Sequence, residues 1–138
     1  MRYALFYAKY FNCPLVLCNK TRKKANEVDT MQIIGDVQGM DVVLIDDMVD
    51  TAGTITKAGQ LIKDSGARSV RAVATHPIFS GSAMERIENS VFDEVIVTDT
   101  IPLTNPSSKI HVLSTAPLFA EVIKRVENYE SLSDLFKK

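Results

Sequence analysis

The segment "VVLIDDMVDTAGTIT", residues 42–56, is the stretch on which the fold of this chain depends. Its apolar start runs directly into two aspartates, Asp46 and Asp47. A continuous apolar run of this length is typical of a strand that is buried on both faces of a parallel sheet. Small and hydroxylated residues follow, and after them apolar residues recur at helical spacing. The segment therefore predicts a strand, a ligand-binding loop and a helix in succession.

Strand-like and helix-like segments alternate along the other parts of the chain as well. Strands are predicted at residues 14–18, 31–37, 41–46, 70–75, 93–98 and 110–113. Helices are predicted at residues 2–11 and 82–89, between about residue 55 and Gly66, and around residues 118–126. The polar residues 19–29 are predicted to form a loop. The alternation predicts an α/β fold, with a three-layer, mostly parallel sheet and helices on both faces.

The composition indicates one globular domain, residues 1–138, with 46% hydrophobic and 24% charged residues. A net charge of -1 supplies no global field for nucleic acid or for an anionic membrane. No apolar stretch is long enough to span a bilayer. The two cysteines do not form a disulfide framework, so a cytoplasmic location is predicted.

The predicted loop has the composition of a phosphate-binding site. Ligands of open parallel sheets collect at the carboxyl ends of the strands, which is where Asp46 and Asp47 are expected. The next residues open a helix, whose first N–H groups are unpaired and lie at the positive end of its dipole. Gly53 lets the backbone come close to a ligand, and Thr51 and Thr54 add hydroxyl donors.

The two carboxylates cannot bind the same phosphate, because like charges repel. They need hydrogen-bond donors or a cation, and the vicinal hydroxyls of a ribose and Mg²⁺ both qualify. The segment therefore predicts a sugar-phosphate site with a metal ion nearby. In the alternative interpretation, Asp50 caps the helix and Asp46 and Asp47 are solvated turn residues.

With these residues in view, "VVLIDDMVDTAGTIT" resembles the ribose-phosphate-binding signature of the type I phosphoribosyltransferase fold. The variant "DDMVDTAGT" is similar to that of ribose-phosphate pyrophosphokinases, the phosphoribosyl-pyrophosphate synthetases. The resemblance continues through "THPIFSG" (75–81), "ERIENS" (85–90) and "SLSDLF" (131–136). It implies an enzyme of nucleotide biosynthesis that transfers diphosphate from magnesium ATP to ribose 5-phosphate.

The resemblance implies a role for each part of the loop at residues 46–54. Asp46 and Asp47 would face the ribose hydroxyls and the Mg²⁺ ion. The 5-phosphate would be held by Asp50, Thr51, Ala52, Gly53 and Thr54.

Two further segments receive roles from the resemblance. Residues 19–30 would be a mobile catalytic loop, in which Lys20 and Arg22 stabilise the charge of the transferred group. The residue between them is threonine, where the family usually has arginine. Ser131, Ser133 and Phe136 would line an allosteric nucleotide site at a subunit contact. In a plainer interpretation, the same segment docks Leu132, Leu135 and Phe136 on the core.

Members of the resembled family have two similar domains and about twice this length. We therefore expect the chain to be the carboxyl-terminal half of such an enzyme, without its amino-terminal domain. An exposed sheet edge and exposed apolar surface are expected consequences. The isolated chain is predicted to have little or no synthetase activity, and the family's assembly implies a homo-oligomer.

Two other functions fit parts of the sequence. A small phosphoribosyltransferase of nucleotide salvage would use the same phosphate loop, but it needs a hood over its base, for which only residues 19–37 are available. A non-catalytic regulatory subunit would not need Asp46, Asp47, Lys20 or Arg22, so their presence weighs against this alternative. Binding of free bases would distinguish the first, and ligand binding that survives loss of Asp47 would favour the second.

Overall fold

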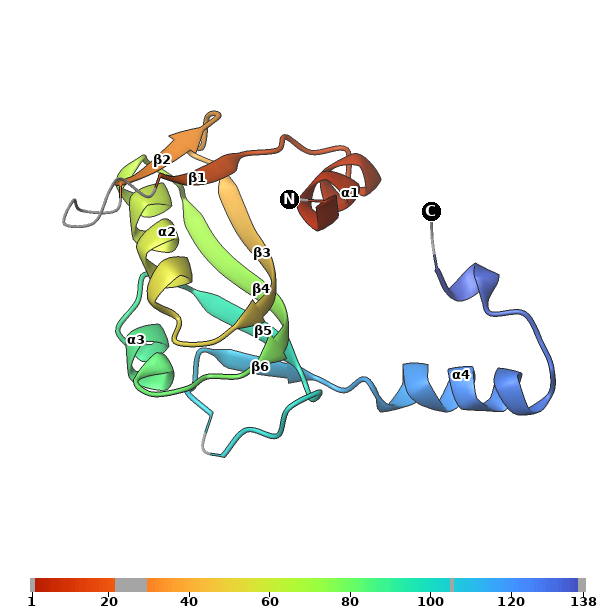
Figure 1. Cartoon of the computed structure of the whole chain (residues 1–138). Helices are drawn as coiled ribbons and strands as arrows, with labels where there is room; N and C mark the ends of the chain where they lie inside the picture. The colour runs from red at the N-terminus through yellow and green to blue at the C-terminus, as the bar shows by residue number, and fades with distance from the viewer. Residues whose placement is uncertain (1, 22–29, 105, 137–138) are drawn as a thin grey trace.

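The computed structural model describes residues 2–21, 30–104 and 106–136 of the chain. Helices and strands alternate along most of it, as the sequence predicted (Figure 1). In chain order the elements are α1 (Arg2–Tyr10), β1 (Leu17–Thr21), β2 (Thr30–Ile34), β3 (Asp41–Val49), α2 (Gly53–Asp64), β4 (Ser69–Pro77), α3 (Ala83–Glu88), β5 (Glu94–Thr98), β6 (Ile110–Leu113), α4 (Ala116–Glu127) and the short 3₁₀ helix η1 (Ser133–Leu135).

Four strands form a parallel sheet in the order β3-β4-β5-β6. In the register, Val42 lies opposite Val70, and Ala72 lies opposite Val95. All four carboxyl ends therefore meet at one edge of the sheet, where ligands of such folds bind. The α/β class with a parallel sheet flanked by helices is confirmed.

The first two predicted strands differ from expectation. β1 and β2 pair antiparallel in a separate hairpin, with Cys18 opposite Ile33. β1 begins at Leu17 and runs to Thr21, so the prediction that residues 19–21 belong to a loop was wrong. Residues 22–29 lie outside the described residues. Backbone pairing with β2 extends β1 to Thr21, and polar side chains do not prevent such pairing.

The central strand is also longer than predicted. β3 continues to Val49, because Met48 and Val49 still lie opposite His76 and Pro77 of β4. Asp46 and Asp47 therefore lie within β3, and the strand continues past them to Val49.

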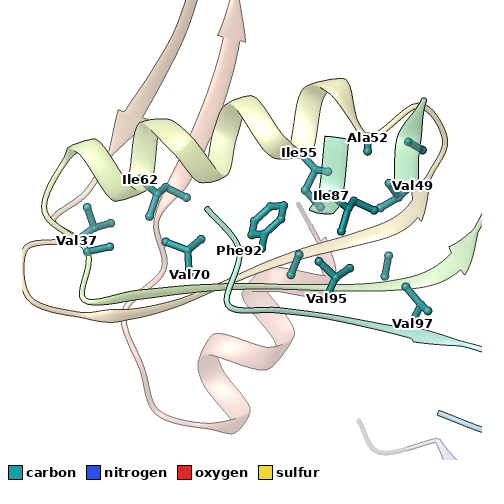
Figure 2. Packing of buried hydrophobic residues seen from close by; sticks show 14 residues of the cluster. Val37, Val49, Ala52, Ile55, Ile62, Val70, Ile87, Phe92, Val95 and Val97 are labelled. Atoms are coloured by element: carbon teal, nitrogen blue, oxygen red, sulfur yellow. The ribbon is translucent and has the colours of Figure 1, made fainter. Parts of the chain in front are cut away.

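The hydrophobic core lies on one face of the sheet, under α2 and α3. Figure 2 shows side chains of both helices meeting those of the strands around Phe92. The apolar positions of α2 that were predicted from helical spacing are all buried: Ile55, Ala58, Gly59 and Ile62. Val70, Val95 and Val97 of the sheet are almost completely enclosed beneath them.

The other face of the sheet is only partly covered. The face of β3 that points away from α2 is open at Val43, which is 50% exposed. The prediction that this strand is buried on both faces was therefore wrong. α1 lies beside β3 on the side opposite α2, whereas α4 extends away from the sheet and contains no buried residue (Figure 1).

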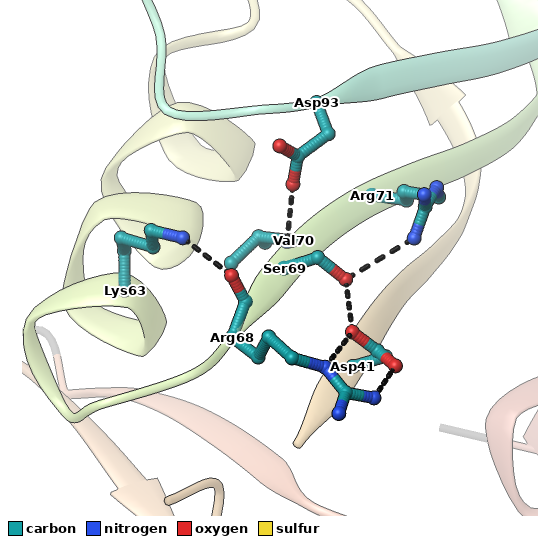
Figure 3. Close-up of polar contacts among 7 residues, drawn as sticks. All are labelled: Asp41, Lys63, Arg68, Ser69, Val70, Arg71 and Asp93. Carbon is teal, nitrogen blue, oxygen red and sulfur yellow. Dashed lines mark hydrogen bonds and ion pairs between the residues drawn. The ribbon is translucent and has the colours of Figure 1, made fainter. Parts of the chain in front are cut away.

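Polar contacts fasten the amino-terminal ends of β3 and β4. Asp41 pairs with Arg68 and accepts a hydrogen bond of 2.6 Å from Ser69 Oγ (Figure 3). Lys63 Nζ donates to the carbonyl oxygen of Arg68 at 2.7 Å, which ties the end of α2 to the same corner. These contacts lie at the amino ends of the strands, so the opposite end is left for a ligand.

In the part of the chain that the structure describes, no helix has both the length and the apolar character that crossing a bilayer requires.

Replacement of Gly59 by alanine tests the packing of α2 on the core. An added Cβ would lie 2.7 Å from Phe92 Cε1 and 2.9 Å from Phe92 Cζ. In an open helix alanine is better than glycine by roughly 1 kcal/mol, but here the clash should reverse the sign. We expect Gly59→Ala to lower the free energy of unfolding by about 1–3 kcal/mol in urea titrations. Adding Phe92→Leu should recover part of that loss, and a more stable Gly59→Ala protein would contradict the packing.

Candidate functional site

A pocket of about 240 Å³ lies at the carboxyl end of β3, where the chain turns into α2. Its lining contains every predicted site residue between 46 and 54 except Asp47. The lining residues are Asp46, Met48, Val49, Asp50, Thr51, Ala52, Gly53, Thr54 and Ile55. The structure therefore brings together the residues that the sequence assigned to a sugar-phosphate loop.

Backbone N–H groups at the start of α2 are available to a ligand. The first hydrogen bond of the helix runs from Thr56 N to Ala52 O, at 3.1 Å. Among the described residues, no acceptor takes the N–H groups of residues 51–55. Unpaired N–H groups at a helix start, with the positive end of the helix dipole, attract anions. The geometry that a phosphate requires is therefore present.

The turn into α2 depends on an unusual backbone conformation at Ala52. Its φ of 60° and ψ of -1° lie in the left-handed region, which costs a non-glycine residue about 1–2 kcal/mol. The side chain of Ala52 is only 4% exposed and packs in the core. Packing thus holds the strained residue at the point where the chain must reverse direction.

Asp50 does not cap the helix. α2 has no side-chain capping hydrogen bond, and the Asp50 carboxylate instead accepts a hydrogen bond from Ser80 Oγ. Ser80 N also donates to Asp50 O at 3.1 Å, and Phe79 N donates to Val49 O at 3.1 Å. The alternative interpretation of Asp50 as a helix cap was therefore wrong. Asp50 instead fastens the loop to the segment that follows β4.

Asp46 and Asp47 have different surroundings. Only Asp46 lines the pocket, although the carboxyl group of Asp47 lies close enough to interact with that of Asp46. Asp46 Oδ1 accepts the N–H of Asp47 at 2.9 Å. Burial raises the pKa of Asp46, and the nearby Asp47 carboxyl raises it further. A cation beside the pair would relieve both effects.

The donor chemistry of this pair fits a hard cation such as Mg²⁺. Carboxylate oxygens are its preferred protein ligands, and it commonly uses one or two of them together with water and phosphate oxygens. Within the described ranges, no three His, Cys, Asp or Glu side chains are grouped to form a complete metal site. Asp46 and Asp47 could therefore hold a metal that a phosphorylated ligand helps to bind.

Arg86 of α3 contacts the loop, although no role was predicted for it from the sequence. Its Nη1 donates to the carbonyl oxygen of Thr51 at 2.8 Å. Arg86 lies 35 positions beyond Thr51, on the exposed side of a short helix. An arginine in such a place normally indicates only a solvated surface, so the sequence contained no signal for this contact beyond the resemblance of "ERIENS".

The side chains of the two predicted catalytic cations lie outside what the structure describes. Lys20 belongs to β1, where its backbone lies opposite Met31 in the hairpin. Arg22 lies outside the described residues, as does most of the predicted mobile loop at 19–30. Their catalytic role stays a prediction.

The predicted allosteric segment folds back on α4. Arg125 of that helix donates to Ser131 O at 3.0 Å and pairs with Asp134. Ser131 Oγ lies 3.0 Å from Ser133 Oγ. Phe136 is 68% exposed, so the alternative that it docks on the core was wrong. The allosteric role of these residues stays a prediction.

Comparison with known families assigns residues 15–137 to the phosphoribosyl synthetase-associated domain. The chain belongs to this family. A ribose-phosphate pyrophosphokinase of Wolinella succinogenes is 56% identical over 133 residues, which are 96% of this chain and 43% of that protein. The ribose-phosphate pyrophosphokinase of Porphyromonas gingivalis is 53% identical over 130 residues, 94% of this chain and 42% of that protein.

A solved structure supports the same assignment. The crystal structure of phosphoribosylpyrophosphate synthetase from Mycobacterium smegmatis matches with a TM-score of 0.85 and 37% identity. The match covers 93% of this chain and 42% of that one. The resemblance to ribose-phosphate pyrophosphokinases and the fold are thus confirmed. The chain spans less than half the length of these relatives.

Proposed function

We propose that this chain is the ribose-5-phosphate-binding part of an enzyme that transfers diphosphate from magnesium ATP to ribose 5-phosphate. The pocket at the end of β3 carries this proposal, because it joins unpaired N–H groups of residues 51–55 to the carboxylate of Asp46. An anion suits the N–H groups, and sugar hydroxyls suit the carboxylate. The names of the relatives support this reaction.

In this proposal each end of the substrate has its own partners. The 5-phosphate lies over the start of α2, with the hydroxyls of Thr51 and Thr54 as further donors. The ribose hydroxyls face Asp46, and Lys20 and Arg22 stabilise the charge of the transferred group. Mg²⁺, when bound beside Asp46 and Asp47, neutralises part of the phosphate charge. The phosphorylated substrates and the two unbridged cysteines favour the cytoplasm as the place of this reaction.

The partner that completes the enzyme is proposed to be the amino-terminal domain of a longer polypeptide. The relatives are more than twice as long as the part that this chain matches. The surface available to such a domain is the apolar side of α4, where Leu118, Phe119, Ile123 and Val126 are each more than half exposed. An exposed apolar stripe of this kind is typical of a contact surface. Assembly of the complete enzyme into a homo-oligomer, with Ser131, Ser133 and Phe136 at an allosteric contact, is proposed from the resemblance.

Ribose 5-phosphate should bind to the isolated chain and shift the amide signals of residues 51–55 in a ¹H–¹⁵N NMR titration. Asp46→Asn should weaken this binding about tenfold, since a hydrogen bond to a charged acceptor is lost. Asp64→Asn, at the far end of α2, is the matched control and should bind like the unaltered chain. Ribose 5-phosphate that shifts none of these amides would contradict the proposal. Tighter binding of phosphoribosyl pyrophosphate together with a free base would instead favour a salvage transferase.

Magnesium should stabilise the chain through Asp46 and Asp47. With ribose 5-phosphate present and Mg²⁺ about tenfold above its dissociation constant, binding adds about 1.4 kcal/mol, or roughly 3–6 °C in Tm. Asp46→Asn should raise the Tm in metal-free buffer, because it removes a charge that partial burial and the neighbouring Asp47 carboxyl disfavour, and should abolish the magnesium shift. Asp64→Asn should keep the shift. A shift that persists in Asp46→Asn in differential scanning fluorimetry would place the metal elsewhere.

The isolated chain should show little or no turnover with magnesium ATP and ribose 5-phosphate. The resemblance places the adenine-binding part of the enzyme in the amino-terminal domain, and this chain matches less than half of its relatives. The full-length enzyme of Wolinella succinogenes, assayed in parallel for AMP release, is the positive control. A rate for the isolated chain close to that of the control would refute this expectation.

A further inference from the structure

We propose that Arg86 is a positioning residue, which holds the phosphate-binding loop in its binding conformation from outside the pocket. The inference rests on the proposed function of that loop. Arg86 does not line the pocket. It acts instead through the backbone carbonyl of Thr51, to which it donates from α3, and its guanidinium fills the space beside Gly53 that a Cβ would need.

The contact with Thr51 fixes the direction of the next N–H group. Arg86 Nη1 lies 2.8 Å from Thr51 O. The carbonyl of Thr51 and the N–H of Ala52 belong to one planar trans peptide unit, in which they point in opposite directions. Fastening the carbonyl to α3 therefore turns the Ala52 N–H away from α3. Because Ala52 is in the left-handed conformation, the orientation of this peptide also sets the start of α2.

The guanidinium also neutralises a dipole that would oppose phosphate binding. A carbonyl oxygen at the loop carries partial negative charge, and a phosphate nearby would be repelled by it. A charge-assisted hydrogen bond from arginine reduces that charge and adds a permanent cation close to the loop. Arg86 thus favours an anion in the pocket without touching it.

Gly53 is explained by the same contact. Gly53 belongs to α2 and does not have a left-handed φ, so the turn itself does not require glycine. An added Cβ would lie 3.3 Å from Arg86 Nη1, which is closer than such contacts normally are. Glycine at this position leaves room for the guanidinium beside the backbone. This reason stands beside the expectation that Gly53 lets a ligand come close.

A second fastening comes from the same part of the chain. Ser80 donates hydrogen bonds to both the carboxylate and the carbonyl oxygen of Asp50, the residue that precedes Thr51. The segment from Ser80 to Arg86 therefore fixes the loop at Asp50 and at Thr51. These hydrogen bonds and the burial of the Ala52 side chain together restrict the loop, so its N–H groups are preorganised for a ligand.

The variants Arg86→Gln and Arg86→Lys, measured with ribose 5-phosphate and with inorganic phosphate, test this inference. Arg86→Gln should weaken both affinities about tenfold and should move the Ala52 amide signal in the ligand-free protein. Arg86→Lys keeps the charge and one donor, so it should restore most of the affinity. Arg71→Gln, another partly exposed arginine with a carboxylate partner on the sheet, is the matched control and should change neither.

Gly53→Ala provides a test that leaves Arg86 in place. It should weaken binding in part by displacing the guanidinium, so the loss in the double variant Gly53→Ala/Arg86→Gln should be smaller than the sum of the two single losses. Losses that add in full would overturn the inference, as would affinities of Arg86→Gln equal to those of Arg71→Gln. An unaltered chain that binds neither probe would refute the proposed function itself, so the two failures are distinguishable.

Discussion

The reversal of the chain between β3 and α2 is the constraint on which the site depends. Only Asp50, Thr51 and Ala52 lie between the last residue of the strand and the first residue of the helix. In this short connection one residue, Ala52, leaves the usual backbone regions, and the helix returns over the sheet. Its side chain is enclosed by the core, so the packing of α2 maintains the strained turn. The start of α2 consequently stands at the end of β3, with its N–H groups unpaired.

The core that holds this turn is built on one face of the sheet. Phe92, Ile62 and Ile87 are almost fully enclosed between the sheet and the helices α2 and α3, whereas Val43 on the other face is about half exposed. A parallel sheet is normally covered on both faces. The open face and the exposed α4 agree with a chain that matches less than half of its relatives. The pocket itself lies at the start of α2, on the covered face.

The sequence predicted the features that depend on neighbouring residues. Helical spacing of Ile55, Ala58, Gly59 and Ile62 identified both α2 and its buried side, because burial of one side imposes that period. The small and hydroxylated residues after Val49 identified the anion-binding turn, since few other residues permit one. The fold class followed from the alternation of such segments.

Features that depend on distant contacts were not predictable in this way. An apolar run such as residues 42–45 indicates burial but not which face is covered, so the open face of β3 was missed. The contact from Arg86 to Thr51 O joins residues 35 positions apart and has no local pattern. The antiparallel pairing of β1 with β2 likewise depends on where residue 21 meets residue 30, which composition does not specify.

The aspartates of the chain show which carboxylates serve the fold and which do not. Asp99 accepts hydrogen bonds from Ser114 and Thr115 at the start of α4, and these donors lower its pKa to about 2. Arg68 lowers the pKa of Asp41 in the same way. Folding favours the charge of both groups. Asp46 differs from both, because partial burial and the neighbouring Asp47 carboxyl raise its pKa. A carboxylate whose surroundings disfavour its charge, and that lies in the pocket beside unpaired N–H groups, is better explained by a ligand than by the fold.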